Sequence, residues 1–100
     1  MEIWHNPRCS RSRAAKQRLD DEGVDYTERR YLDDAPTAEE LDDVLTKLGK
    51  EPWEIARTKE PAYPALLEHD RAQWIEHMVA NPSLIERPII IDGDSARIER

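Results

Sequence analysis

The chain has 100 residues, which is enough for a single domain with one modest hydrophobic core. Apolar residues make up 38% of it and charged residues 37%, and no apolar run approaches the ~20 residues that span a bilayer. The N-terminus has no apolar segment of the secretory type. A single cysteine, Cys9, excludes an internal disulfide framework and a cysteine-rich zinc site. We therefore expect a cytoplasmic protein whose one thiol is either an inert part of the core or the reactive group.

The net charge of −7 is unevenly distributed. Residues 1–18 carry a net +4, and the rest of the chain carries −11. An acidic body repels phosphates, so the charge argues against nucleic acids and anionic membranes as partners and favours a monomer. A basic segment on an acidic body suits a small anion, although on charge alone a solvated basic helix end is the simpler interpretation.

The first third of the chain predicts a βαβ unit, with its two strands parallel and its crossover right-handed. The expected elements are a strand over residues 1–5, a loop at Asn6 and Pro7, a helix capped by Ser10 or Ser12 and stopped by Gly23, and a strand over residues 24–32.

The middle of the chain predicts helices. Thr37 and Glu40 have the spacing of a capping box, and an apolar stripe follows them up to a stop at Gly49. Further along, the pattern predicts a short helix over 52–57, a loop or short helical turn over 61–67, a helix over 71–80 ended by Asn81 and Pro82, and a turn over 83–86.

The C-terminal segment predicts a β-hairpin, with strands over 88–91 and 96–98 joined by a turn at Asp92 and Gly93. Together with the βαβ unit it makes a mixed four-stranded sheet flanked by helices. This is the thioredoxin-like α/β arrangement, in one domain over 1–100 with residues 36–86 as a helical insertion. Pro88 falls where this fold usually keeps a cis proline beside the active cysteine; a trans proline opening an edge strand stays open.

Cys9 lies in a loop that leads into a helix. Backbone amides and the helix dipole at such a position lower the pKa of a thiol. His5, Arg8, Arg11 and Arg13 are close in sequence and can add positive potential. Free cysteine is often only core filling, but these polar neighbours favour the reactive interpretation.

The same loop is a candidate anion site. Backbone amides at a helix start, Ser12 and a nearby arginine can bind a tetrahedral oxyanion, and a thiolate facing it can attack its central atom. The fourth position of a C-x-x-C motif is Ser12, which excludes a dithiol oxidoreductase. Any adduct on Cys9 must therefore be resolved by a thiol from outside the chain.

Residues 5–13, His-Asn-Pro-Arg-Cys-Ser-Arg-Ser-Arg, match the H-N-P-x-C-x-x-S-R loop of the glutaredoxin-dependent arsenate reductases, which the chain resembles over nearly its whole length. Three further segments resemble motifs of that family: 31–41 (Y-L-x-x-x-P-T-x-x-E-L), 57–63 (R-x-x-E-x-x-Y) and 82–88 (P-x-L-I-x-R-P). Arg97 and Arg100 follow at the expected spacing.

The resemblance implies roles for individual residues. Cys9 is the nucleophile, His5 helps to keep it ionised, and Ser12 is a local hydrogen-bond partner. The oxyanion-binding arginines are Arg57, Arg87 and Arg100, with Lys59, Arg8 and Arg97 as substitutes. Guanidinium groups suit this task because they bind oxyanions in bidentate fashion.

The implied activity is reduction of arsenate to arsenite through an adduct on Cys9. Glutathione or an equivalent small thiol is the co-substrate, glutaredoxin is the protein partner, and no metal or bound organic cofactor is needed. Two alternatives stay open: a thiol-dependent reductase of another substrate, and a regulator that binds RNA polymerase, although such regulators carry a C-x-x-C switch. A cysteine phosphatase would need C-x₅-R, and Ala15 stands at the arginine position.

Overall fold

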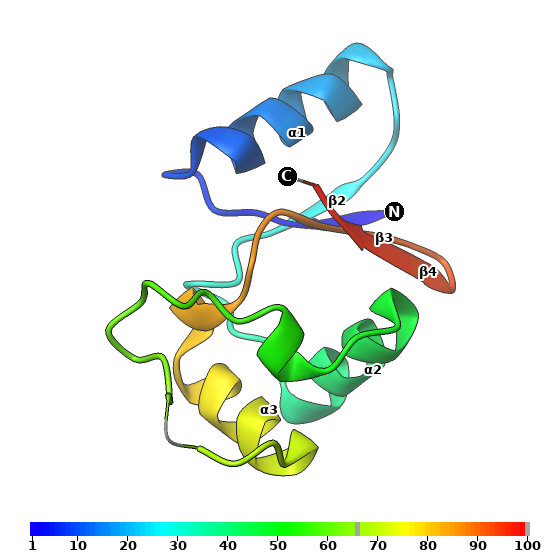
Figure 1. Ribbon diagram of the computed structural model, residues 1–100. Helices are drawn as coiled ribbons and strands as arrows, with labels where there is room; N and C mark the ends of the chain where they lie inside the picture. Colours follow the sequence, from blue (N-terminus) through cyan, green and yellow to red (C-terminus); the bar gives the residue numbers. More distant parts are fainter. Residues whose placement is uncertain (66, 100) are drawn as a thin grey trace. The chain divides into compact units, whose positions relative to one another are not determined.

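The computed structural model describes residues 1–65 and 67–99, and four strands in this part of the chain form one mixed sheet (Figure 1). The strands are β1 (Glu2–Trp4), β2 (Thr27–Arg29), β3 (Ile89–Asp92) and β4 (Ser95–Ile98), in the spatial order β2-β1-β3-β4. β1 pairs parallel to β2 and antiparallel to β3, and β3 and β4 form an antiparallel hairpin. The predicted thioredoxin-like sheet is confirmed.

The strand register decides which segments meet. Trp4 pairs with Arg29 of β2 and with Ile89 of β3, and Ile89 pairs with Ile98 of β4. The carboxyl ends of β1, β2 and β4 therefore lie at the same edge of the sheet as the amino end of β3. The loop after β1 contains Cys9, and the residues just before β3 are Arg87 and Pro88, joined by a cis peptide bond.

Helix α1 (Ser10–Asp21) covers one face of this sheet (Figure 1). Its buried side chains Ala15 and Leu19 pack against Ile3 of β1 and Ile90 of β3. Gly23 follows the helix with φ of 68°, and its amide donates to the carbonyl of Asp20. Glycine is favoured here because it adopts a positive φ without steric cost.

Two predictions about this region are wrong. The expected cap, Ser10 or Ser12, is not the N-cap: Cys9 takes that position, with φ −98° and ψ 124°, and Ser10 is the first helical residue. The second strand is also shorter than the predicted 24–32. β1 has only three residues to pair with, so β2 is limited to Thr27–Arg29, while Val24 and Tyr26 pack on the core beside the sheet.

The chain forms two compact units, one built from Met1–Asp34 and the segment from Arg87 onward, the other from Ala35–Glu86. The second unit contains α2 (Ala38–Leu48), the 3₁₀ helix η1 (Pro52–Glu54), α3 (Arg71–Ala80) and the 3₁₀ helix η2 (Pro82–Leu84). α2 packs against α3, and α3 also contacts both 3₁₀ helices. The buried side chains of this unit include Leu41, Leu45, Ile55, Trp74, Met78, Leu84 and Ile85.

The predicted capping box of α2 is confirmed. Thr37 Oγ1 accepts from the amide of Glu40 at 3.1 Å, and a carboxylate oxygen of Glu40 accepts from the amide of Thr37 at 3.0 Å. Gly49 ends the helix with φ of 68°.

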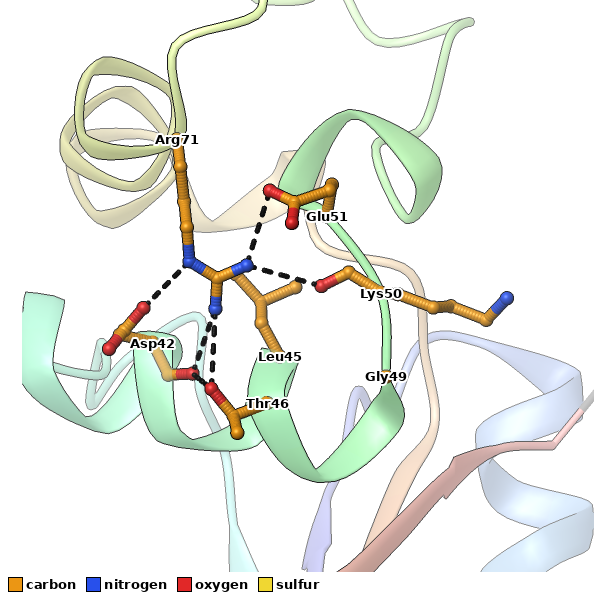
Figure 2. A pocket seen from close by; sticks show the side chains of 7 residues that line it. All are labelled: Asp42, Leu45, Thr46, Gly49, Lys50, Glu51 and Arg71. Atoms are coloured by element: carbon orange, nitrogen blue, oxygen red, sulfur yellow. Dashed lines mark hydrogen bonds and ion pairs between the residues drawn. The ribbon is translucent and has the colours of Figure 1, made fainter.

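Arg71, at the start of α3, joins α3 to α2 and η1 (Figure 2). Its Nε atom donates to Asp42 at 2.8 Å and its Nη2 atom donates to the carbonyl of Asp42 at 3.2 Å. Its Nη1 atom lies 3.2 Å from a carboxylate oxygen of Glu51 and donates to the carbonyl of Lys50 at 3.4 Å. One guanidinium group thus connects α3, α2 and the start of η1 within this unit.

Three further predicted elements need correction. The short helix over 52–57 is only η1, because Ala56 instead forms an antiparallel bridge with Ile85. The turn over 83–86 is η2, which begins at Pro82. The hairpin turn is shifted by one residue to Gly93 and Asp94, because Asp92 pairs with Ser95.

The predicted segment 61–67 forms turns in its described residues; position 66 lies outside them. None of the helices in the described part of the chain has the length and apolar character that crossing a membrane requires.

Candidate functional site

The loop between β1 and α1 is shaped by Asn6. The carbonyl of Asn6 accepts from the amide of Cys9 at 3.0 Å, and its side-chain Oδ1 accepts from the amide of Arg8 at 3.0 Å. This side-chain turn brings Cys9 to the first position before α1, where the backbone amides of the next residues are free of helical partners. Sequence reasoning gave Asn6 no function of its own, although an asparagine before Pro7 is a typical turn signal.

The pKa of the Cys9 thiol is lowered. Burial alone raises it, but hydrogen bonds from the backbone amides of Ser12 and Arg11 and from the side chain of Arg87, together with the positive charge of Arg87, outweigh that effect. The thiol is half-buried. A lowered pKa increases the fraction of thiolate, which is the nucleophilic form of cysteine.

Arg87 has an unused hydrogen-bond donor. Its Nε atom is buried and has no hydrogen-bond partner among the described residues. A buried guanidinium N–H without a partner is uncommon in proteins and calls for an acceptor. A tetrahedral oxyanion beside Cys9 would supply one, in the bidentate geometry that a guanidinium group favours.

The side chains of His5 and Ser12, at the two ends of this loop, form a buried hydrogen-bonded pair. The Nδ1 atom of His5 lies 2.6 Å from Ser12 Oγ, which also accepts from the amide of Asn6 at 3.0 Å. The pKa of His5 is lowered, mainly because burial disfavours the imidazolium, although the charge of Glu28 acts in the opposite direction. Burial therefore disfavours a positive charge on His5, and the positive charge that lowers the pKa of the thiol is that of Arg87.

The remaining candidate cations are paired, exposed or outside the described residues. Arg57 belongs to the Ala35–Glu86 unit, where its amide donates to the carbonyl of Leu84 at 2.8 Å and its guanidinium forms an ion pair with Glu60. Arg97 bonds to Glu99 at 3.1 Å. Of the other candidates, Lys59 and Arg8 are exposed, and Arg100 lies outside the described residues.

The structure thus brings Cys9, Ser12, His5 and Arg87 together within one unit. Across residues 1–65 and 67–99, no group of three or more His, Cys, Asp or Glu side chains is arranged to hold a metal ion.

Comparisons with known proteins identify the family. Residues 4–100 match the family model for the ArsC family. An arsenate reductase from Haemophilus influenzae is 35% identical over 98% of this chain and 89% of its own length. An uncharacterized protein in the glnII region of Streptomyces viridochromogenes is 47% identical over 98% of this chain and 88% of its own.

Comparison with a solved structure indicates the same family. An arsenate reductase from Vibrio cholerae superposes with a TM-score of 0.89 at 33% identity, covering 98% of this chain and 89% of that one. Sequence and structure agree over nearly the whole length, and the chain therefore belongs to the ArsC family.

Proposed function

We propose that this chain is an arsenate reductase that uses Cys9 as its nucleophile. The observation that carries the proposal is the Cys9 thiol itself. Its pKa is lowered by two backbone amides and by Arg87, whose buried Nε atom has no partner among the described residues. A thiolate and an unsatisfied guanidinium side by side suit attack on a bound oxyanion.

Arsenate binds at the amino end of α1, with Arg87 donating to its oxygens. Arg57 and Arg100 complete the oxyanion site, as the family resemblance implies. The ion pair of Arg57 with Glu60 leaves part of its guanidinium available to a second acceptor. No prosthetic group takes part.

The reaction begins when the Cys9 thiolate attacks arsenic, forming an S–As bond while an arsenate oxygen leaves as water. Glutathione, or an equivalent small thiol, then adds to the same arsenic, and a second water leaves. A glutaredoxin thiolate attacks the glutathione sulfur and forms a mixed disulfide. The electron pair of the broken S–As bond stays on arsenic, which is thereby reduced from the +5 to the +3 state. Hydrolysis of the remaining S–As bond releases arsenite and regenerates Cys9.

His5 and Ser12 act as positioning residues in this scheme. Ser12 Oγ joins the His5 side chain to the Asn6 amide, and the backbone amide of Ser12 donates to the thiolate. The pair thereby holds the first turn of α1 against the end of β1. His5 supports ionisation of Cys9 through this geometry rather than through its own charge.

The two compact units act as a single domain in this proposal, with Ala35–Glu86 as a helical insertion into the thioredoxin-like unit. The net charge of −7 opposes self-association, so the working form is a monomer. A cytoplasmic location supplies the reduced thiols that the cycle consumes.

A coupled assay tests the proposal. Arsenate is added to the protein with glutathione, glutaredoxin, glutathione reductase and NADPH, and NADPH oxidation is followed. Turnover that disappears in Cys9→Ser but persists in Ser10→Ala supports the proposal, provided that circular dichroism shows both variants to be folded. A second assay with thioredoxin and its reductase identifies the reductant. No turnover with either system, or turnover retained in Cys9→Ser, contradicts the proposal.

A further inference from the structure

A groove runs along α1 from the end that carries Cys9. It is lined by Arg11, Ala14, Ala15 and Arg18 of the helix and by Glu99 just after β4, is open to solvent, and has a volume of about 360 Å³. The four helical residues have the i, i+3, i+4, i+7 spacing of a single helix face. A volume of this size lies in the range of small-molecule sites.

The charges around the groove leave one cation available. Arg18 forms ion pairs with Glu99 and Glu22, and Arg97 also bonds to Glu99. Arg11, by contrast, is exposed, and its side chain has no hydrogen bond or ion pair with any residue in the described part of the chain. Its guanidinium is thus free to bind an anion from solution.

One residue that lines the groove also contacts the reactive thiol through its backbone. The backbone amide of Arg11 donates to Cys9, so the helix residue with the free guanidinium is also in contact with the nucleophile. From Arg11 to Arg18 the helix rises about 10 Å, which is also about the length of an extended tripeptide. The floor of the groove is the small apolar pair Ala14 and Ala15, which leaves room for a ligand backbone.

We propose that this groove binds one arm of the reducing thiol, a short peptide thiol with carboxylate groups, the class to which glutathione belongs. A carboxylate of the ligand pairs with Arg11, the peptide arm lies over Ala14 and Ala15, and the thiol faces the arsenic held on Cys9. Glutathione carries a net negative charge at neutral pH, and the groove, with two arginines and one glutamate, carries a net positive one. This inference rests on the proposed function.

Steady-state kinetics of two variants at the exposed residue Ala14 test whether the groove binds the thiol. Ala14→Glu adds a carboxylate beside Arg11, and Ala14→Lys adds a cation at the same place. We expect Ala14→Glu and Arg11→Ala to raise the KM for glutathione about three- to fivefold, the size expected for one exposed ion pair. Ala14→Lys leaves that KM unchanged or lowers it. The KM for arsenate stays constant in the two Ala14 variants, and Lys50→Ala controls for a change of net charge outside the groove.

A binding measurement separates this inference from the proposed function, because it requires no turnover. S-methylglutathione, which cannot react, is titrated into the full chain while the backbone amide resonances of Ala14, Ala15 and Arg18 are followed by NMR. Saturable shifts at these amides that weaken in Ala14→Glu and with added salt support the groove, even if the protein reduces no arsenate. Arsenate turnover with no shift at these amides and no change of glutathione KM in Ala14→Glu overturns the groove and leaves the proposed function standing.

Discussion

The Nδ1 atom of His5 lies 2.6 Å from the Oγ atom of Ser12, and both side chains are buried. The same Oγ atom accepts from the amide of Asn6. One hydroxyl group therefore connects the end of β1, the start of the Cys9 loop and the first turn of α1. The nucleophile is held by a buried polar cluster rather than by apolar packing alone.

Ser12→Ala tests this cluster. The substitution removes a hydroxyl and leaves the His5 imidazole and the Asn6 amide buried without a partner. We expect a loss of about 1–3 kcal/mol in the free energy of unfolding, the usual cost of an unsatisfied buried polar group. Urea unfolding measures it. Ser10→Ala, two positions earlier at an exposed site, is the control and is expected to change stability by less than about 0.5 kcal/mol. Equal stability of the two variants would show that the cluster is not stabilising.

Arg87→Met tests the source of the lowered thiol pKa. The substitution removes the side-chain hydrogen bond and the positive charge, both of which favour the thiolate. The pKa of Cys9 should therefore rise. Since the thiolate is the reacting form, the rate of alkylation rises with pH through this pKa, and its midpoint moves upward in the variant. Iodoacetamide alkylation between pH 5 and pH 10 measures it.

Arg97→Met provides the matched control for Arg87→Met. Arg97 is a neighbouring arginine bonded to Glu99, and we expect its loss to leave the alkylation midpoint of Cys9 in place. An unchanged midpoint in Arg87→Met would assign the lowered pKa to the helix amides alone.

Much of the architecture could be predicted from local signals. The capping box at Thr37 marks the start of α2, because its side chains accept hydrogen bonds from free backbone amides of the first turn. The glycine after each of α1 and α2 marks a helix end, because it adopts a positive φ. The mixed four-stranded sheet followed from the βαβ unit and the hairpin. The site loop was also predictable, because Cys9 directly precedes a helix.

Other features depend on partners that are distant in sequence. The length of β2 is set by the three residues of β1 with which it pairs. Val24 and Tyr26 have the alternation of a strand, but their side chains pack against the core and their backbones lie outside β2. Ser12 has the local features of a helix cap, but its hydroxyl bonds to His5 instead. The multiple bonds of Arg71 link segments that no local pattern connects. Tertiary contacts override local preference at each of these positions.

Arg57→Ala separates oxyanion binding from thiol activation. In the proposed function Arg57 binds arsenate, whereas it takes no part in lowering the Cys9 pKa. We expect the KM for arsenate to rise about tenfold or more, the cost of a charge-assisted hydrogen bond to an anion. The alkylation midpoint of Cys9 should stay constant. Lys47→Ala, a cation of α2 that pairs with Asp43, is the control. An unchanged arsenate KM in Arg57→Ala would remove this residue from the oxyanion site.

Glu28 gives a pH-dependent stability that can be measured without any substrate. Hydrogen bonds from Arg30 and from Lys16 lower its pKa from 4.5 to about 2. The carboxylate of Glu28 is thus stabilised in the folded state relative to the unfolded chain. A group with a lowered pKa contributes its full stability above its unfolded pKa and loses it as the pH falls toward the folded one. The contribution is therefore complete above about pH 5, decreases as the pH falls from 4.5 to about 2, and is fully lost only below the folded pKa.

Glu28→Gln removes this contribution. At pH 7 we expect the variant to be less stable than the parent chain by about 1 kcal/mol, because solvent screens part of each ion pair. Near pH 2 the difference should shrink to a few tenths of a kcal/mol, since Glu28 is then fully protonated in the unfolded chain and about half-protonated in the folded protein. Urea titrations at pH 7, 4 and 2 measure the difference, with Glu76→Gln on the exposed side of α3 as the control. A stability difference that persists unchanged at pH 2 would mean that Glu28 acts through packing and not through its charge.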